Sequence, residues 1–280
     1  MSNKKYMSDK KYLAVGGKGF CNCFKNLMSV LRLNEKSKTT VQRCGLIFED
    51  KTLMFDPTSD NISDYVEYRG WRLKVLNTDN DIPVNFCEVF DRNHPKWTDS
   101  VNADKRHVDH QYLKIPISFR KKIINLIDTR LKIKSELLEI VDKFYKKHGP
   151  YDSVHLRTFC TDRTYGMQSR YNYYLNIQKN KFIDAINSCQ NEKVFISYDL
   201  VPELKDIISK CKSKEIITFD KLNFNVDLYG EGAINFNDFL NDFLNLLILS
   251  KGNRMILHEL STFSEVAWYY SNCNEDIIVI

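Results

Sequence analysis

A histidine and an arginine stand two residues apart where a short apolar segment meets a polar loop. The segment Ser153-Val-His-Leu-Arg157 ends on the pair His155 and Arg157, and the loop that follows carries Asp162 and Arg163. An arginine stays charged in proteins and can donate two hydrogen bonds to one phosphate group. Arg157 is therefore a candidate anion ligand. A buried structural arginine and a hydrogen-bonded core histidine are the plainer interpretations of this pair.

A second candidate anion site is the segment Ser261-Thr-Phe-Ser264, which opens a helical pattern. A helix start carries a partial positive charge and backbone N–H groups without intrahelical partners, so it often binds phosphate. We predict that Thr262 is the N-cap residue and that Glu265 folds back to complete a capping box. An ordinary capped helix explains the same residues without any ligand.

A carboxylate provides the third cluster. Asp199 closes the apolar segment VFISYD, just before a helix-like segment that contains Pro202. Its side chain could cap that helix, or it could accept hydrogen bonds from the ribose or the base of a nucleotide.

The second half of the chain predicts a parallel sheet that would bring these three clusters together. Short apolar segments alternate there with helical patterns, which is typical of strand–helix–strand units with helices on both faces of the sheet. Ligands of such sheets bind at the carboxyl ends of the strands, so one nucleotide could contact all three clusters. The expected strands are 153–157, 193–197, 215–219 and 254–257, and the expected helices are about 176–188, 201–211, 236–250 and 264–271.

The dipeptide Gly149-Pro150 follows a long helical pattern over 118–147. Because glycine followed by proline is a helix stop signal, we place a domain boundary here, with one domain over 1–149 and another over 150–280. In the first domain we expect a strand at 12–15, a helix at 23–33, and short strands at 44–48 and 52–55.

Composition disfavours several classes of protein. The chain has 280 residues and a formal net charge of +5, with basic residues spread along the sequence. Nucleic-acid-binding proteins need a clustered basic face, so nucleic acid is not an expected partner. The eight cysteines form no CxxC pair, and no apolar run is long enough to span a membrane. These features and the polar N-terminus favour a cytoplasmic protein with reduced thiols and no integral membrane segment.

Two segments have residue types found in metal sites. We interpret Asp79-Asn80-Asp81 as a turn, because Asp and Asn are common turn residues. His107 and His110 are interpreted as solvated loop residues. No metal and no cofactor are therefore expected.

Four motifs, in this order, resemble those of the fucosyltransferase superfamily, which includes α1,2-, α1,6- and protein O-fucosyltransferases. They are GGKGFCN ending at Asn22, VHLRT with His155 and Arg157, ISYD ending at Asp199, and the block from Asp242 to Ser271 that contains STFS. The similarity covers both ends and the second half of the chain, and residues 57–115 have no match. The chain departs from the family pattern at Cys21 and at Thr158, where a small residue and a second arginine are usual.

The resemblance implies an α/β fold of the GT-B type, in which two Rossmann-like domains face a cleft. The N-terminal domain would then bind the acceptor and the C-terminal domain the donor, GDP-fucose. By this match His155 and Asp199 would contact the nucleoside, and Arg157 the β-phosphate. The full set matched to the donor site is Asn22, His155, Arg157, Asp199, Ser261, Thr262, Phe263 and Ser264.

The resemblance also implies an activity, the metal-independent, inverting transfer of fucose from GDP-fucose to a hydroxyl of a glycan or glycolipid precursor. Arg157 and the helix start at Thr262 would stabilise the negative charge on the departing GDP. Asp162 is the candidate catalytic base, and Arg163 a phosphate or acceptor contact. One alternative is a nucleotide-sugar-binding protein without catalysis. Another is a Rossmann-type methyltransferase or oxidoreductase, although Gly17-Lys18-Gly19 lacks the third glycine of a dinucleotide-binding turn.

Overall fold

The structure is a computed structural model, and the chain divides into two units. It describes residues 133–158, 167–224, 229–230, 234–259, 261–273 and 276–280, with short pieces at 11–14, 21, 41–42, 73–76, 83–84, 121 and 124–125. One unit comprises 1–135 and 228–234, and the other 136–227 and 235–280. This division assigns helix α3 (Ser135–His148), apart from its first residue, to the second unit. The domain boundary expected after residue 149 stays a prediction.

The first unit contains a mixed sheet with the strand order β2-β1-β3-β4. Strand β1 runs parallel to β2 and antiparallel to β3, and β3 runs antiparallel to β4. The strand expected at 12–15 is found one residue earlier. The helix expected at 23–33 and the strands expected at 44–48 and 52–55 lie outside the described residues. The strands are β1 (Lys11–Ala14), β2 (Val41–Gln42), β3 (Leu73–Leu76) and β4 (Pro83–Val84).

The second unit is built on a five-stranded parallel sheet with the order β11-β10-β5-β6-β7. All four strands expected here are confirmed, with ends shifted by one or two residues. The fifth, β11, is an Ile-Ile-Val segment that the sequence analysis did not assign. The strands are β5 (Asp152–Leu156), β6 (Lys193–Tyr198), β7 (Glu215–Ile217), β10 (Met255–Leu257) and β11 (Ile277–Val279). A separate pair, β8 (Tyr229–Gly230) and β9 (Ile234–Asn235), precedes α7.

The strand order reverses direction between β5 and β10. Numbered along the chain within this sheet, the strands follow the order 3-2-1-4-5, so the chain first builds outward from β5 through β6 to β7 and then returns to the other side of β5. After β5 the chain continues toward the β6 side of the sheet, and after β10 it continues toward the β11 side. In open parallel sheets this reversal is where ligands bind, at the carboxyl ends of the strands.

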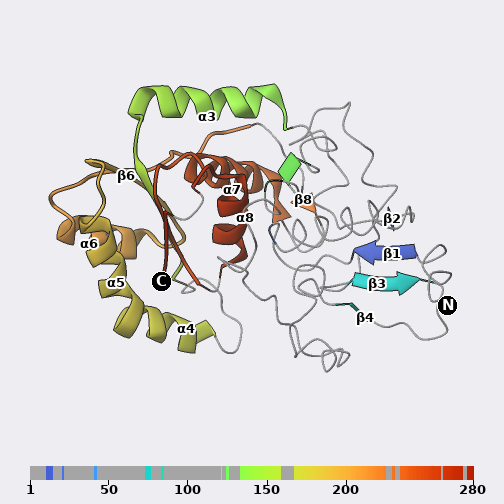
Figure 1. Ribbon diagram of the computed structural model, residues 1–280, viewed down its shortest axis with the longest axis horizontal. Helices are drawn as coiled ribbons and strands as arrows, with labels where there is room; N and C mark the ends of the chain where they lie inside the picture. Colours follow the sequence, from blue (N-terminus) through green and yellow to red (C-terminus); the bar gives the residue numbers. More distant parts are fainter. Residues whose placement is uncertain are drawn as a thin grey trace, which may run out of the picture. The chain divides into compact units, whose positions relative to one another are not determined.

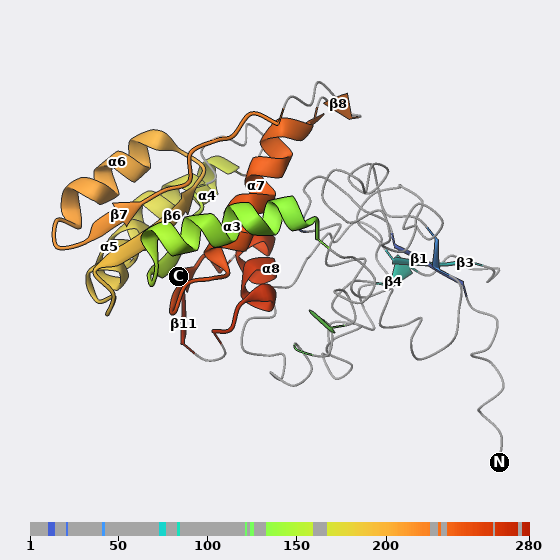
Figure 2. The ribbon, with the colours of Figure 1, turned by 90° about the horizontal axis from the view of Figure 1, so that it is seen from above.

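Helices cover both faces of this sheet (Figure 1). The continuous segment α4 (Met167–Tyr173), η5 (Tyr174–Gln178) and α5 (Lys179–Asn187) lies on one face with α6 (Val201–Lys210). The other face carries α3, α7 (Phe236–Leu249) and α8 (Thr262–Tyr270) (Figure 2). The helices expected at 201–211, 236–250 and 264–271 are confirmed. The one expected at 176–188 begins earlier, at Met167, and includes a π-helical turn, η5.

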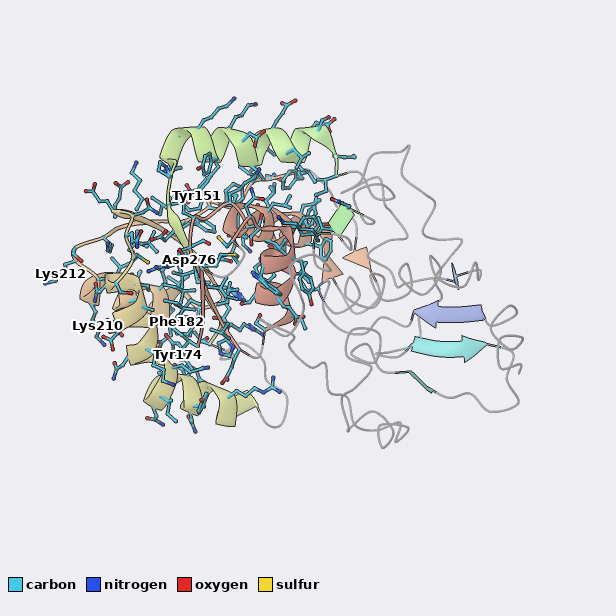
Figure 3. All side chains as sticks on the ribbon, viewed as in Figure 1. Tyr151, Tyr174, Phe182, Lys210, Lys212 and Asp276 are labelled. Carbon is cyan, nitrogen blue, oxygen red and sulfur yellow. The ribbon has the colours of Figure 1, made fainter. Side chains whose placement is uncertain are left out.

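The alternation of side chains along each strand determines which helices they contact. Val154 and Ile196 pack with Phe182 and Ile207 on the α5–α6 face, and all four are fully buried or nearly so. Figure 3 places Tyr174 and Phe182 on this helical layer. Neighbouring strand positions face the opposite layer, where Phe195 makes an edge contact with Phe144 of α3.

Hydrogen bonds join β5 to the end of α7 on this second face. The hydroxyl of Tyr151 donates to the backbone oxygen of Ile248 at 2.8 Å, and the hydroxyl of Ser153 donates to that of Leu249 at 2.8 Å. Both bonds are buried, so they fix how the last turn of α7 sits on β5. No helix among the described residues combines the length and apolar character that crossing a membrane requires.

Candidate functional site

Strand β5 directs His155 and Arg157 to different surroundings. His155 is the penultimate residue of the strand and lies opposite Ser197 of β6. Its side chain is only 5% exposed. It lies on the face covered by α8, because the ring of Phe263 packs against its imidazole with centroids 4.7 Å apart. Arg157 follows the last strand residue and keeps 24% of its side chain exposed. The arginine is therefore at the carboxyl edge of the sheet, where a ligand can reach it.

A carboxylate from the neighbouring strand holds Arg157. An amino nitrogen of its guanidinium donates to Oδ2 of Asp199 at 2.7 Å. The same carboxylate accepts from the backbone N–H of Thr158, at 3.0 Å to Oδ1 and 2.9 Å to Oδ2, and from the Thr158 hydroxyl at 2.9 Å. Asp199 thus joins the ends of β5 and β6 and orients the arginine.

This role of Asp199 replaces one of the two expected from the sequence. The N-cap residue of α6 is Leu200, and no side chain accepts a capping hydrogen bond there. Asp199 therefore does not cap α6, because its carboxylate is turned toward the end of β5 instead. Thr158, which stands where a second arginine is usual in the family, is fully buried and completes this link.

The N-cap residue of α8 is Ser261, and the expectation that Thr262 would cap this helix is wrong. Ser261 has an extended backbone (φ −118°, ψ 114°), and its hydroxyl accepts from the backbone N–H of Ser264 at 3.4 Å. Thr262 is the first helical residue and is partly exposed. With the cap one residue earlier, Glu265 is displaced from the third helical position that a capping box requires.

Glu265 is buried, and the phenolic hydroxyl of Tyr269, one turn further along α8, donates to its carboxylate. This bond runs along the helix, away from the cap residue at the helix start. A buried carboxylate needs hydrogen-bond donors, and Tyr269 supplies one.

The hydroxyl of Ser264 lies at the centre of a buried network. Its Oγ is 2.6 Å from Nδ1 of His155 and accepts from the backbone N–H of His258 at 3.2 Å. The hydroxyl of Ser261 lies 3.4 Å from the same Nδ1 atom. Ser264 is fully buried, so the first turn of α8 is attached to both β5 and the residue after β10.

Burial keeps both histidines of this network neutral. It lowers the pKa of His155 well below its ordinary value of 6.5, and the positive charge of Arg157 lowers it further. Burial also lowers the pKa of His258 to about 3, with Arg157 and Arg170 contributing. The positive charge of Arg157 contributes to the lowered pKa of both rings.

Sequence reasoning missed three residues that surround this arrangement. His258 and Gln178 are each 1% exposed, and Nε2 of His258 lies 3.0 Å from Oε1 of Gln178. Asp242 of α7 keeps part of its side chain exposed, yet desolvation by the surrounding protein raises its pKa to about 6 against the opposing charges of Lys221 and Arg157. The motif block from 242 to 271 contained Asp242 and His258, but nothing in a single sequence separated them from other polar residues of that block.

Most of the predicted donor-site residues come together at one edge of one sheet. They are His155, Arg157, Asp199, Ser261, Thr262, Phe263 and Ser264, and all belong to the second unit. Asn22, Asp162 and Arg163 lie outside the described residues, as do the segments 79–81 and 107–110. Cys21, the neighbour of Asn22, is described and is buried in the first unit.

The fold is similar to that of fucosyltransferases of known structure. The chain matches the crystal structure of the fucosyltransferase NodZ from Bradyrhizobium with a TM-score of 0.51, at 12% identity and over 94% of both chains. A structure of NodZ α-1,6-fucosyltransferase soaked with GDP-fucose matches with a TM-score of 0.50, at 14% identity, over 94% of this chain and 93% of that chain. The resemblance inferred from the motifs is therefore confirmed at the level of the fold.

A third match is partial. It relates 59% of this chain to 52% of POFUT1 in complex with GDP-fucose, with a TM-score of 0.36 and 15% identity, so that it spans about half of that chain. No family model matches the sequence. No curated protein matches it either.

Proposed function

We propose that the protein is a glycosyltransferase that transfers fucose from GDP-fucose to a hydroxyl group of a glycan or glycolipid precursor. The proposal includes a GT-B arrangement of two domains and an inverting reaction without a metal ion. The observation that carries it is the position of Arg157, Asp199 and the start of α8 at the point where the strand order of a parallel sheet reverses. This is where nucleotides bind in sheets of this type.

The residues at this edge suit a departing diphosphate. When the bond from fucose to GDP breaks, negative charge builds on the β-phosphate. A guanidinium can share that charge through paired hydrogen bonds. Backbone N–H groups at the start of α8 can receive the same charge, aided by the partial positive charge of the helix end. Losing one such donor costs roughly 10²–10³ in rate in enzymes that stabilise a developing anion.

Asp199 would act through Arg157. The carboxylate holds the guanidinium before a donor substrate arrives, so little reorganisation is needed when charge develops, which is the condition under which fixed dipoles and charges are most effective. His155 would contact the nucleoside, and Phe263, which packs on the neutral imidazole of His155, would lie next to the phosphates. Asp162 is proposed as the base that accepts the proton of the acceptor hydroxyl. Arg163 is proposed as a phosphate or acceptor contact, and Asn22 as a residue near the diphosphate or the acceptor.

Nucleotide binding provides a direct test. Thermal unfolding is followed with GDP, UDP, NAD and S-adenosylmethionine, because a ligand that binds only the folded state raises the unfolding temperature. We expect stabilisation by GDP that is absent in Arg157→Ala. Stabilisation by NAD or S-adenosylmethionine, with no response to GDP, would instead identify a Rossmann-type enzyme of another class.

Catalysis is tested separately with GDP-fucose and a panel of glycan acceptors, by measuring GDP release. Release that depends on the acceptor and is lost in Arg157→Ala supports a transferase. GDP binding without release across a broad acceptor panel would favour the alternative of a nucleotide-sugar-binding protein. The same assay with a chelator added tests whether the reaction requires a metal ion.

A further inference from the structure

Two polar side chains that are almost completely buried lie directly behind the start of α8. Gln178 is the last residue of the π-helical turn η5, and His258 follows strand β10. Each is 1% exposed, and Oε1 of Gln178 lies 3.0 Å from Nε2 of His258. This pair connects the helical layer on one face of the sheet to the loop that leads into the candidate phosphate-binding turn.

The hydrogen bonds of the Gln178 amide determine which of the two side chains donates to the other. The amide nitrogen of Gln178 donates to Oε1 of Glu259 at 3.4 Å, so its amide oxygen faces His258. The opposite amide orientation would set an oxygen against the carboxylate and an NH₂ group against the ring nitrogen. Nε2 of His258 therefore carries the proton and donates to Gln178, and the imidazole is neutral, in keeping with its depressed pKa.

The main chain of His258 is hydrogen-bonded to the first turn of α8. Its backbone N–H donates to Oγ of Ser264, and that oxygen is also 2.6 Å from Nδ1 of His155. A shift of His258 would move Ser264 and, with it, the backbone N–H groups of the first helical turn. The direction of those N–H groups determines how well they bind an anion.

The π-helical turn presents Gln178 to this loop. Tyr174, Gln178 and Phe182 are buried on the side of the helix that faces the sheet, while Leu175 and Ile177 between them are exposed. Short π-helical turns inside α-helices are frequent at functional sites. Burial of an amide and an imidazole costs free energy that an apolar pair would not incur. The pair contributes directional hydrogen bonds that an apolar pair would lack.

From these contacts we propose that Gln178 and His258 are positioning residues of the nucleotide diphosphate site, which hold the 261–264 turn in the orientation that binds phosphate. This inference rests on the proposed function, and neither side chain is proposed to touch the ligand. It predicts that loss of the Gln178–His258 hydrogen bond weakens GDP binding.

The test compares two variants that lose side-chain hydrogen bonds at opposite ends of the strands of the same sheet. Gln178→Met loses the buried bond from His258 and the longer bond to Glu259, and the control loses the part-buried bond between Asn191 and Asp152. Gln178→Met has nearly the same shape as glutamine but cannot accept the bond from His258. The control, Asn191→Leu, loses the 2.6 Å bond from the Asn191 amide to Oδ1 of Asp152, at the amino end of β5. GDP affinity is measured by titration calorimetry on the full chain, and thermal unfolding of each variant is recorded alongside.

We expect both variants to unfold at a lower temperature than the wild type. The Kd for GDP should rise about tenfold in Gln178→Met, which corresponds to about 1.4 kcal/mol, and less than about twofold in Asn191→Leu. An unchanged Kd in folded Gln178→Met would overturn the inference, and so would an equal loss of affinity in both variants, because that would indicate a general effect of lower stability.

A second variant and the wild-type protein provide two further tests. If Gln178→Met does not fold, Gln178→Asn retains an amide but withdraws it by one methylene, and the same loss of GDP affinity is expected. A wild-type protein that binds no GDP would refute the proposed function itself. That result is distinct from a wild type that binds GDP and a Gln178 variant that binds it equally well, which refutes only the positioning role.

Discussion

The guanidinium of Arg157 and the carboxylate of Asp199 lie 2.7 Å apart, although 42 residues separate them in the sequence. The pair joins the ends of β5 and β6 and is partly buried, with 24% of the arginine side chain and 12% of the aspartate side chain exposed. It fixes a positive charge at the carboxyl edge of the sheet, and this charge contributes to the lowered pKa of His155 and His258. The proposed chemistry depends on this fixed charge.

Replacement of Asp199 by asparagine tests whether this carboxylate orients Arg157. An asparagine amide keeps one acceptor but loses the charge and turns an NH₂ group toward the donors of Arg157 or Thr158. We expect GDP affinity to fall about tenfold in Asp199→Asn, as for loss of one charge-assisted hydrogen bond. Asp206→Asn is the matched control, because Asp206 of α6 also pairs with basic side chains, Lys179 of α5 and Lys210 of α6. An Asp199→Asn protein with wild-type affinity would refute the orienting role.

Arg157→Lys separates the charge of this residue from its geometry. Lysine is a point charge and cannot form the paired hydrogen bonds of a guanidinium. The expected result is a decrease of roughly 10²–10³ in the rate of GDP release, the scale of one lost transition-state donor. Arg254 immediately precedes β10 and pairs with Asp276, so Arg254→Lys should retain the wild-type rate. Equal rates for Arg157→Lys and the wild type would mean that charge alone suffices.

Single alanine substitutions at the start of α8 should lower the free energy of unfolding by amounts that follow the contacts of each side chain. Ser264→Ala removes the buried hydroxyl that links His155 to the N–H of His258, so it should cost about 1–3 kcal/mol of unfolding free energy. Ser261→Ala removes the N-cap and should cost about 1 kcal/mol. Thr262→Ala should cost less than about 0.5 kcal/mol. Urea unfolding measures all three, and a larger effect at Thr262 than at Ser261 would contradict the observed cap.

Acid should destabilise the protein through His258. The folded state holds this ring neutral with a pKa of about 3, whereas its ordinary value is 6.5. Above pH 6.5 the ring is neutral in both states and has no effect. As the pH falls from 6.5 toward 3, the unfolded state binds a proton that the folded state does not, so stability falls by up to about 1.4 kcal/mol per pH unit.

The acid effect can be assigned to this residue by denaturant unfolding of the wild type and His258→Gln at several pH values between 7 and 4. The unfolding free energy of the variant should fall less steeply with decreasing pH over this range. The difference in slope should correspond to about one proton fewer bound on unfolding. His155, whose pKa is also lowered, remains in both proteins and contributes equally. Identical pH slopes would show that His258 does not bind a proton preferentially in the unfolded state.

The sequence by itself determined most elements of the second unit and proposed several candidate site residues within it. Apolar alternation and helical periodicity are local properties, so they located β5, β6, β7, β10 and most helices to within a few residues. The motif containing Arg157 and the STFS segment also predicted residues that the structure brings to one edge of this sheet. The prediction of the N-cap residue of α8 was less accurate, because the serine or threonine at 261, 262 and 264 each has the chemistry of a cap. The extended backbone of Ser261 identifies it as the N-cap residue.

Only the tertiary structure decided how these parts meet. The strand order puts β10 beside β5, and this brings Ser264 to His155 across 109 residues and Gln178 to His258 across 80. Sequence patterns report the environment of a residue relative to its neighbours along the chain. They do not report its partners across the sheet, because those depend on which strands pair and on which layer each helix covers.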